Sequence, residues 1–415
     1  MRIGIVSMDT RGGIQPYLAL GLGLRDAGHD VRVVAPATFQ PLLEETGLPL
    51  APLTGDIEAT VRSLSDATGG GRAGMRIAAR ELAPWIRTWT LETLAGTEDR
   101  ELITGGVGGM VLGGSVAEKL GVPFIPTHLQ PIGLASSAYP GVLTAGVPHW
   151  LGPIGRRLSH PVSDLGVWLP FRSAMRSARE DVLGLGGRRR TPRVPVLYGF
   201  SRHVVPVSPR VAPDRHVTGY WFLPRSGGWS PPTGLESFLA LDDRVVSIGF
   251  GSMASRDPAE VTALVRMATR DAGVRAVLLS GWGGMATPEP SDDLFVADAV
   301  PHDWLFERVI AAVHHGGAGT TAAVMRAGIP GVIVPFGVDQ PFWAGRAQAL
   351  GVSPPPIARS KLTTARLAAS IGIAVANGSM RTRARELGAR IRAEDGIQEA
   401  VRVLGAIASA RSPRV

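Results

Sequence analysis

His314-His315-Gly316-Gly317-Ala318-Gly319-Thr320-Thr321 is the stretch of sequence that decides the fold. It follows an apolar run, residues 310–313, of the kind that is buried in parallel sheets, and it opens a helical segment, residues 322–327. Glycines allow a close approach of the backbone, and the N–H groups at a helix N-terminus point at an anion. The stretch therefore predicts a strand, an anion-binding turn and a helix, with His315 and Thr320 as further donors. We expect no metal ion there, since these donors and the helix dipole neutralise negative charge.

Alternating strands and helices surround this turn in both halves of the chain. Residues 2–8 and 30–35 predict two strands, and Pro16 suits the first turn of the helix between them. A proline-rich stretch, residues 206–242, precedes a second series that starts with a strand at 244–250. Such repeats indicate parallel sheets, so we predict an α/β protein of two Rossmann-like domains facing a central cleft. The expected boundaries are residues 1–205 for the N-terminal domain, 206–242 for the linker, 243–395 for the C-terminal domain and 396–415 for a tail that returns towards the N-terminal domain.

The composition narrows the class of protein. The 415 residues are 45% apolar and 19% charged, which is typical of a globular chain with two domains. The sequence has no cysteine, which excludes disulfides and thiolate catalysis. Residues 1–8 lack a signal-peptide pattern and no run reaches the ~18 apolar residues of a membrane helix, so we expect a cytoplasmic protein. The net charge of +8 comes mainly from arginines that are not interleaved with aromatic residues, so we expect no nucleic-acid partner, while peripheral membrane contact stays open.

A dinucleotide-binding fingerprint is a second interpretation of the glycine turn. Residues 317–322 fit G-x-G-x-x-A, and Asp339 lies twenty residues beyond Gly319, a spacing that suits a ribose-binding acid. This short motif is common by chance, and it does not explain the two histidines. An NAD-dependent oxidoreductase is therefore the third of the functions that we consider.

Five further motifs accompany the glycine turn, and together with it they are specific. They are residues 301–306 (PHDWLF), 335–343 (PFGVDQPFW), 197–201 (LYGFS), 217–222 (VTGYWF) and 249–253 (GFGSM). On these motifs the chain resembles the bacterial glycosyltransferases of the UDP-glycosyltransferase superfamily (GT1 type), in the branch of sterol and antibiotic glucosyltransferases. The resemblance covers almost the whole chain.

The resemblance implies a fold, a reaction and a set of site residues. It implies the GT-B fold, with the acceptor bound mainly by the N-terminal domain and the nucleotide sugar by the C-terminal domain. The reaction would be inverting transfer of a hexose from UDP-glucose, or another UDP- or dTDP-sugar, to a hydroxyl of an apolar acceptor such as a sterol, polyketide, flavonoid or antibiotic aglycone, with no other cofactor. The residues implied at the donor are Ser252 near the phosphates, Val300 against the base, His315 with Gly317, Gly319 and Thr320 on the diphosphate, and Asp339 and Gln340 on the sugar hydroxyls.

The catalytic base departs from the family pattern. Inverting transfer needs a base that takes the acceptor proton, and the family carries aspartate or histidine for it in the first glycine-rich turn. The matching position here is Gly13, which can transfer no proton. Asp9 in the same turn or His128 after another strand could substitute, and an acceptor that is already ionised would need no strong base. A nucleotide-sugar-binding homologue that assists a partner enzyme without transferring sugar is the alternative function.

Aromatic residues of the N-terminal half suggest an apolar acceptor, because rings supply a large contact area. A glycine-rich loop around residues 69–71 could act as a flap over it. The aromatic residues are Trp85, Trp89, Tyr139, Trp150, Trp168 and Phe171.

Overall fold

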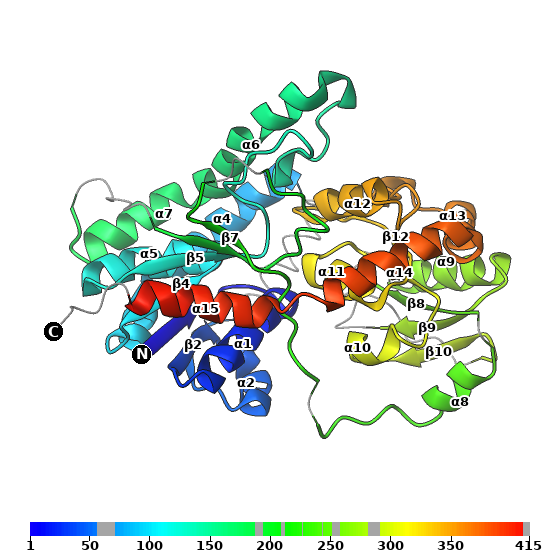
Figure 1. Cartoon of the computed structure of the whole chain (residues 1–415), viewed down its shortest axis with the longest axis horizontal. Coiled ribbons are helices and arrows are strands. Elements are labelled where there is room, and N and C mark those ends of the chain that lie inside the picture. Colours follow the sequence, from blue (N-terminus) through cyan, green and yellow to red (C-terminus); the bar gives the residue numbers. More distant parts are fainter. Residues whose placement is uncertain are drawn as a thin grey trace.

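Two parallel sheets form the cores of two α/β domains (Figure 1). The structure is a computed structural model that describes residues 1–55, 71–186, 194–208, 212–225, 227–242, 244–250, 258–280 and 291–409. The strand order is β3-β2-β1-β4-β5-β6-β7 in the N-terminal sheet and β10-β9-β8-β11-β12 in the C-terminal sheet. All strand pairs of the two sheets in these residues are parallel, so the predicted α/β class with two parallel sheets is confirmed.

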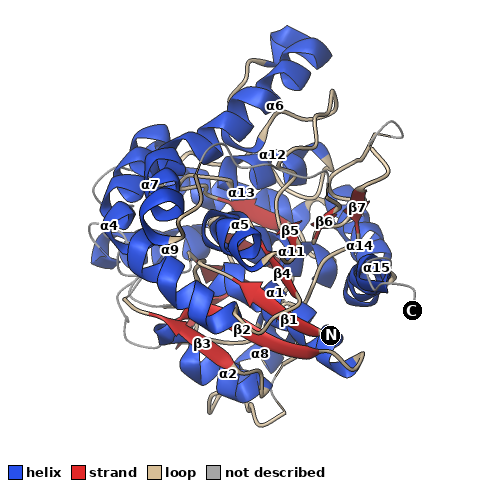
Figure 2. Ribbon diagram, turned by 90° about the vertical axis from the view of Figure 1, so that its left-hand side faces the viewer, coloured by secondary structure: helices blue, strands red, loops and turns tan. Residues whose placement is uncertain are grey.

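The N-terminal sheet fans across one end of the molecule, with helices on both faces (Figure 2). Its strands are β1 (Arg2–Val6), β2 (Asp30–Pro36), β3 (Leu50–Leu53), β4 (Leu102–Gly105), β5 (Phe124–His128), β6 (Val196–Tyr198) and β7 (Arg215–Val217). Its α-helices are α1 (Arg11–Asp26), α2 (Gln40–Thr46), α4 (Gly71–Thr97), α5 (Val107–Leu120), α6 (Gly152–Trp168) and α7 (Arg172–Ser177). Shorter turns are η1 (Ala37–Phe39), η2 (Val142–Thr144), η3 (His149–Leu151), η4 (Leu169–Phe171) and the π-helical η5 (Ala178–Val182).

The C-terminal sheet has five strands and a similar arrangement of helices. Its strands are β8 (Val245–Gly249), β9 (Arg275–Leu279), β10 (Leu294–Ala297), β11 (Ala311–His314) and β12 (Gly331–Ile333). The helices of this half are α8 (Leu235–Ala240), α9 (Pro258–Asp271), α10 (His302–Leu305), α11 (Ala318–Ala327), α12 (Gln340–Ala349), η6 (Arg359–Lys361), α13 (Thr364–Ala376), α14 (Gly378–Arg392) and α15 (Gly396–Ser409). Among the described helices, none combines the length and the hydropathy that a membrane span requires.

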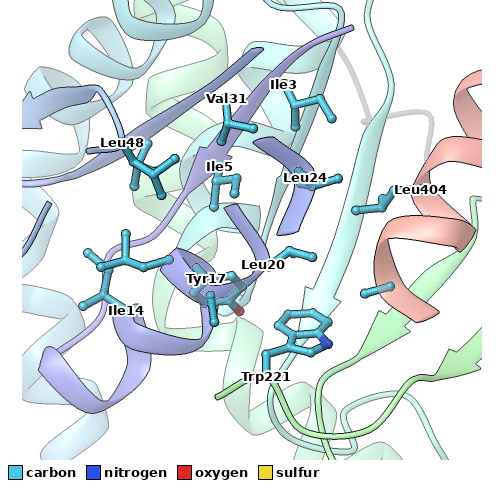
Figure 3. Close-up of a cluster of buried hydrophobic side chains, with 14 of the residues drawn as sticks. Ile3, Ile5, Ile14, Tyr17, Leu20, Leu24, Val31, Leu48, Trp221 and Leu404 are labelled. Carbon is cyan, nitrogen blue, oxygen red and sulfur yellow. The ribbon is translucent and has the colours of Figure 1, made fainter. Parts of the chain in front are cut away.

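The first βαβ unit forms the centre of the N-terminal core. Ile3 and Ile5 of β1 pair with Val31 and Val33 of β2, and all four side chains are buried beneath α1. Figure 3 shows this cluster, with α15 lying beside it through Leu404. Full burial of each such aliphatic side chain contributes about 1.5–3 kcal/mol, so the cluster fixes the position of the turn between β1 and α1.

The chain crosses between the domains twice, and the two crossings touch. The first crossing follows β7, and the second joins α14 to α15, which packs on α1 of the N-terminal domain (Figure 1). Trp221 Nε1 donates to the carbonyl oxygen of Gly396 at 3.1 Å. A Cβ on Gly396 would lie 2.5 Å from the carbonyl oxygen of Tyr220, so only glycine fits there. Because β7 pairs with β6, the N-terminal sheet extends into residues 206–242, the range expected to be a linker.

Candidate active site

The glycine turn of the C-terminal domain joins β11 to α11. Gly316 has φ +86°, and a Cβ there would lie 2.7 Å from Cγ2 of Ile333. Gly317 is the N-cap of α11, and a Cβ on it would lie 2.5 Å from Nε2 of His315. The imidazole of His315 therefore lies directly against the start of α11. Because the first N–H groups of a helix have no acceptor within the helix, the turn presents them beside this ring.

Three buried polar atoms around this turn have no hydrogen-bond partner among the described residues. They are His314 Nε2, His315 Nδ1 and Thr321 Oγ1. His314 uses its other ring nitrogen, Nδ1, to accept from the N–H of Gly316 at 3.1 Å. An unpaired buried polar group costs about 1–3 kcal/mol, so a polar or anionic ligand that bonds to His315 would recover part of that energy.

Burial also controls the charge of the histidines at this turn. It lowers the pKa of His315 to about 4, with a smaller contribution from His302. The ring of His302 stacks on Phe306 at 4.7 Å, and burial lowers its pKa to about 4 as well. At pH 7 both rings are therefore neutral, and His315 can donate one hydrogen bond to a phosphate oxygen without bringing a full charge.

The glycine turn of the N-terminal domain joins β1 to α1, and Asp9 occupies the space beside Gly13. A Cβ on Gly13 would lie 2.5 Å from the Cβ of Asp9 and 3.2 Å from its Oδ1. Ser7 Oγ donates to Asp9 Oδ2 at 3.2 Å, which fixes the carboxyl group. The carboxylate of Asp9 thus fills the position that a side chain at residue 13 would take.

The surroundings of Asp9 suit a base that works near neutral pH. Burial raises its pKa to about 6, the hydrogen bond from Ser7 opposes this rise, and the charge of Asp339 adds to it. The carboxyl group is therefore ionised at pH 7, yet far more basic than an ordinary aspartate. A general base is most effective when its pKa lies near the working pH.

Asp339 joins the two domains through its carboxylate. Its Oδ2 accepts from Nε1 of Trp343 at 3.0 Å and from Nε2 of Gln130, in the N-terminal domain, at 3.1 Å. Burial raises its pKa. The charge of Asp339 also makes a small contribution to the raised pKa of Asp9.

Gln340 holds the loop that precedes α12. Its Oε1 accepts from the backbone N–H groups of Phe336 at 2.7 Å and Gly337 at 3.2 Å. The loop also contains Val338 with φ +53°, a left-handed conformation that costs a non-glycine residue about 1–3 kcal/mol. Gln340 can therefore offer a ligand the N–H donors of its amide, while its oxygen maintains the loop.

The N-terminal ends of α1 and α11 face each other across the domain boundary. A Cβ on Gly319 would lie 3.3 Å from the carbonyl oxygen of Gly12. The anion-binding turn and the turn that carries Asp9 are therefore neighbours, with Thr320 half-buried between them and the body of α11.

Of the remaining predicted residues, His128 and Val300 are buried, and Ser252 lies outside the described part of the chain. His128 is buried on β5, its ring packs on Tyr198 at 5.9 Å, and burial followed by the charge of Arg215 lowers its pKa to about 4. The charge of Arg215 contributes to the pKa shift of His128, whereas the charge of Asp339 contributes to that of Asp9. The two candidate bases therefore have different charged neighbours. Val300 is buried with Trp304 in the C-terminal core. Ser252 lies outside the described residues.

The aromatic residues expected near an acceptor separate into core and surface. Trp89 and Tyr139 are each 1% exposed, and Trp89 Nε1 donates to the carbonyl oxygen of Thr54 at 2.6 Å. Trp150, in contrast, is 75% exposed. The expected flap at residues 69–71 falls largely outside the described residues, and α4 begins at Gly71.

Three site residues were not predicted from the sequence: Ser7, Gln130 and His302. Ser7 directly follows β1, and Gln130 comes two residues after β5. Ligands of parallel α/β sheets bind beyond the carboxyl ends of the strands, so polar residues just after a strand were the available signal. His302 opens α10 after β10, and its proximity to His315 appears only in the folded chain.

The chain is similar to known proteins in sequence and in fold. A family model described as "Erythromycin biosynthesis protein CIII-like, C-terminal domain" matches residues 284–407. The chain is 34% identical over 422 residues to a sterol 3-beta-glucosyltransferase of Neosartorya fischeri, in an alignment that covers 97% of this chain and 29% of that protein. The chain thus spans less than a third of the length of this curated relative.

Solved structures share the fold of the whole chain. The calicheamicin glycosyltransferase CalG4 superimposes with a TM-score of 0.68 at 16% identity, covering 99% of both chains. The Streptomyces sp. SF2575 glycosyltransferase SsfS6, complexed with thymidine diphosphate, gives a TM-score of 0.62 at 20% identity, covering 98% of this chain and 99% of that one. The predicted GT-B fold is therefore confirmed.

Proposed function

The chain belongs to the UDP-glycosyltransferase superfamily of GT1 type, and from this premise we propose that it is an inverting glycosyltransferase. It transfers a hexose from a UDP- or dTDP-sugar to a hydroxyl group of an apolar small molecule. The observation that carries the proposal is the meeting of the two glycine turns. Asp9 fills the space beside Gly13, and the charge of Asp339 contributes to its raised pKa. The N-terminal end of α11 faces the same turn.

In the proposed reaction the N-terminal turn acts on the acceptor hydroxyl and the C-terminal turn acts on the leaving diphosphate. Asp9 takes the proton of the acceptor hydroxyl while that oxygen attacks the anomeric carbon of the donor sugar. The bond from this carbon to the diphosphate oxygen breaks, and the diphosphate leaves with the bonding electrons. His315 and the first N–H groups of α11 donate to the departing diphosphate and stabilise its charge. Attack from the opposite face inverts the anomeric configuration.

The sugar hydroxyls meet groups suited to hold a polyol. The Asp339 carboxylate accepts hydrogen bonds, and the Gln340 amide donates them. We assign the backbone of Val300 to the nucleoside base and Ser252 to the phosphates, and both assignments rest on the family motifs. Gly317, Gly319 and Thr320 belong to the diphosphate turn.

The nature of the acceptor is inferred from the relatives. The Neosartorya fischeri protein is named for a sterol, and CalG4 for calicheamicin. Both names support an apolar, polycyclic or antibiotic aglycone as the acceptor class. The SsfS6 complex with thymidine diphosphate supports a nucleotide sugar as the donor.

One observation favours a second candidate, a nucleotide-sugar-binding homologue that assists a partner enzyme without transferring sugar. Gly13 stands where the family carries its base. If Asp9 does not act on the acceptor, the donor site would remain while transfer is lost.

Acceptor-dependent turnover distinguishes these functions. The purified chain is incubated with UDP-glucose or dTDP-glucose and a panel of sterol, polyketide and flavonoid acceptors, and release of nucleoside diphosphate is measured. We expect release only with an acceptor, and a product whose anomeric configuration by NMR is opposite to that of the donor. Stabilisation by UDP or dTDP without turnover on any acceptor would support the non-catalytic homologue. A chain that NAD alone stabilises would contradict both.

The thermal measurement is sensitive enough for this purpose. A ligand at a hundred times its dissociation constant adds roughly 2.7 kcal/mol to the free energy of unfolding. The unfolding temperature with UDP, dTDP or NAD therefore identifies the nucleotide before an acceptor is known.

A further inference from the structure

Helix α6 buries Ser159, His160 and Ser163 together with Val167, and it exposes a row of apolar side chains. It projects from the body of the N-terminal domain in both views (Figures 1 and 2). A surface helix of a globular protein normally turns its apolar stripe towards the core. Burial against the rest of this chain therefore does not account for the exposed apolar residues of α6.

The buried side of α6 is held by hydrogen bonds to the loop before it. Ser159 Oγ accepts from the N–H of Gly141 at 2.8 Å, and Ser163 Oγ accepts from the N–H of Leu143 at 2.9 Å. His160, 1% exposed, contacts the N–H of Ser136 through Nε2 at 3.2 Å. These bonds fix the rotation of the helix, so its opposite side has to face outward.

The outward side forms a continuous apolar stripe. Ile154, Leu158, Val162 and Leu165 follow one another at intervals of three or four residues, which places them within about 80° of the helix circumference. Their exposed fractions are 73%, 66%, 51% and 59%. Trp150 in η3, 75% exposed, and Leu169 in η4, 47% exposed, extend the stripe at both ends. We call these six residues the α6 stripe.

The charges around the stripe are almost all positive. Arg157 is exposed on α6, and Arg172 and Arg176 are exposed on α7, which follows it. Between residues 150 and 177 the sequence contains four arginines and one acid, Asp164. The carboxylate of Asp164 is turned inward, where it accepts from the N–H of Gly133 at 3.3 Å. An apolar stripe bordered by arginines is complementary to a surface with an apolar interior and anionic groups at its edge.

We propose that η3 and α6 dock the protein on an anionic lipid bilayer. The α6 stripe lies at the boundary between headgroups and acyl chains, with Trp150 at its tip, and the arginines contact the lipid phosphates. Amphipathic helices with tryptophan and basic residues bind membranes in this way, and each basic residue near an anionic surface adds to the attraction. Docking does not depend on glycosyl transfer, but it would give the proposed enzyme access to an apolar acceptor dissolved in the same lipid.

Vesicle co-sedimentation without donor or acceptor tests the docking. The full chain is mixed with vesicles of phosphatidylcholine alone or with an equal share of phosphatidylglycerol. We expect binding to the anionic vesicles that weakens with salt, and much weaker binding to the neutral ones. The triple variant Ile154→Gln, Leu158→Gln, Leu165→Gln should bind at least about tenfold more weakly, because the apolar contact area is lost.

A matched control changes exposed apolar residues of the other domain. Leu241→Gln with Met267→Gln, 75% and 51% exposed in the parent, should bind as the parent does. Subtracting the emission spectrum of Trp150→Phe from that of the parent gives the emission of Trp150 alone. This emission should shift to shorter wavelength when anionic vesicles are added, because the indole ring enters the lipid. Circular dichroism of each variant confirms that the helices are retained.

Three outcomes would overturn the proposal. The first is a parent that does not sediment with anionic vesicles, and the second is an α6 triple variant that binds as well as the control variant. The third is a parent that is dimeric by light scattering, becomes monomeric in the triple variant and binds no vesicles, because a second copy of the chain would then cover the stripe. Since no assay here requires turnover, failure of the proposed transferase function would leave each readout intact.

Discussion

The two glycine turns share a strand–turn–helix arrangement, but the pKa values of their functional groups shift in opposite directions. Each follows a buried strand and opens a helix, and each has a glycine whose missing side chain makes room for a functional group from earlier in the turn. Asp9 fills the space beside Gly13, and His315 fills the space beside Gly317, each at 2.5 Å from the Cβ that is absent. Burial then raises the pKa of the carboxyl group to about 6 and lowers that of the imidazole to about 4. One turn thereby gains a stronger base, and the other a neutral donor.

This comparison changes the meaning of Gly13. Taken from the sequence alone, it marks a lost catalytic base. In the structure it is the reason that Asp9 can reach the site, because any side chain at residue 13 would collide with that carboxylate. The base is thus moved along the turn in this proposal, and the following predictions test whether the two turns differ as described.

The largest effect is expected from Asp9→Asn. Loss of a general base typically lowers the rate by about 10²–10⁴-fold. We expect kcat to fall by this factor, with little change in the affinity for the nucleotide. In the parent, kcat should rise with pH through about 6 and level off above it, since the ionised carboxylate is the active form. An Asn variant with the activity and pH profile of the parent would exclude Asp9 as the base.

The corresponding change in the other turn, His315→Ala, should act on the donor. One hydrogen bond to a charged phosphate contributes about 1.5–3 kcal/mol, which corresponds to roughly 10–100-fold in affinity. Titration calorimetry with UDP and dTDP measures the effect directly. His128→Ala is a useful comparison, since it removes a buried imidazole on β5 of the N-terminal domain. Equal nucleotide affinity in parent and His315→Ala would contradict the assignment.

A pair of neighbouring substitutions isolates the space beside Gly13. In Gly13→Ala the new methyl group meets Asp9 at 2.5 Å, whereas in Gly12→Ala it meets nothing within 4 Å. Because a misplaced catalytic group costs much of its contribution, we expect kcat of Gly13→Ala to fall about tenfold or more, and that of Gly12→Ala to stay near the parent. Similar kcat values for both variants would show that the placement of Asp9 is unimportant.

The smallest effect concerns stability and has the opposite sign to the effect on rate. A folded-state pKa of about 6, against an unfolded value of about 3.9, means that the folded state holds the proton more tightly, so stability falls as pH rises between these values. Above pH 6 the penalty is constant. Asp9→Asn should therefore be more stable than the parent at pH 8, by at most about 3 kcal/mol, and nearly as stable as the parent at pH 4. Denaturant titration at both pH values measures this difference, and a destabilised variant at pH 8 would contradict it.

The parts of the fold that were predicted are those encoded by local patterns. The strand, glycine turn and helix of residues 310–327 and the first βαβ unit each follow from a short run of residues. The strands β6 and β7 were missed because each has only three residues, and β7 lies among prolines that indicate a linker. Helix α6 was missed because three of its four buried residues are serine or histidine, which no hydrophobic pattern identifies.

The site shows the same division. The diphosphate turn is local, so its residues could be proposed from sequence, and their roles there stay predictions. The contact between Gln130 and Asp339 joins residues 209 positions apart, and no local spacing encodes it. The position of Asp9 depends on how the backbone folds between Ser7 and Gly13, which residue types alone do not determine.

The touching crossings at Gly219 and Gly396 have a mechanical consequence. Two covalent connections that were far apart would restrict rotation of one domain relative to the other. Here the backbones meet, with a Cβ on Gly219 only 3.2 Å from the Cα of Gly396, so they act as a single pivot. A rotation of one domain about that point would change the distance between the two glycine turns more than it would change the contacts near the crossings. Such a rotation would leave α15 packed on α1 of the N-terminal core.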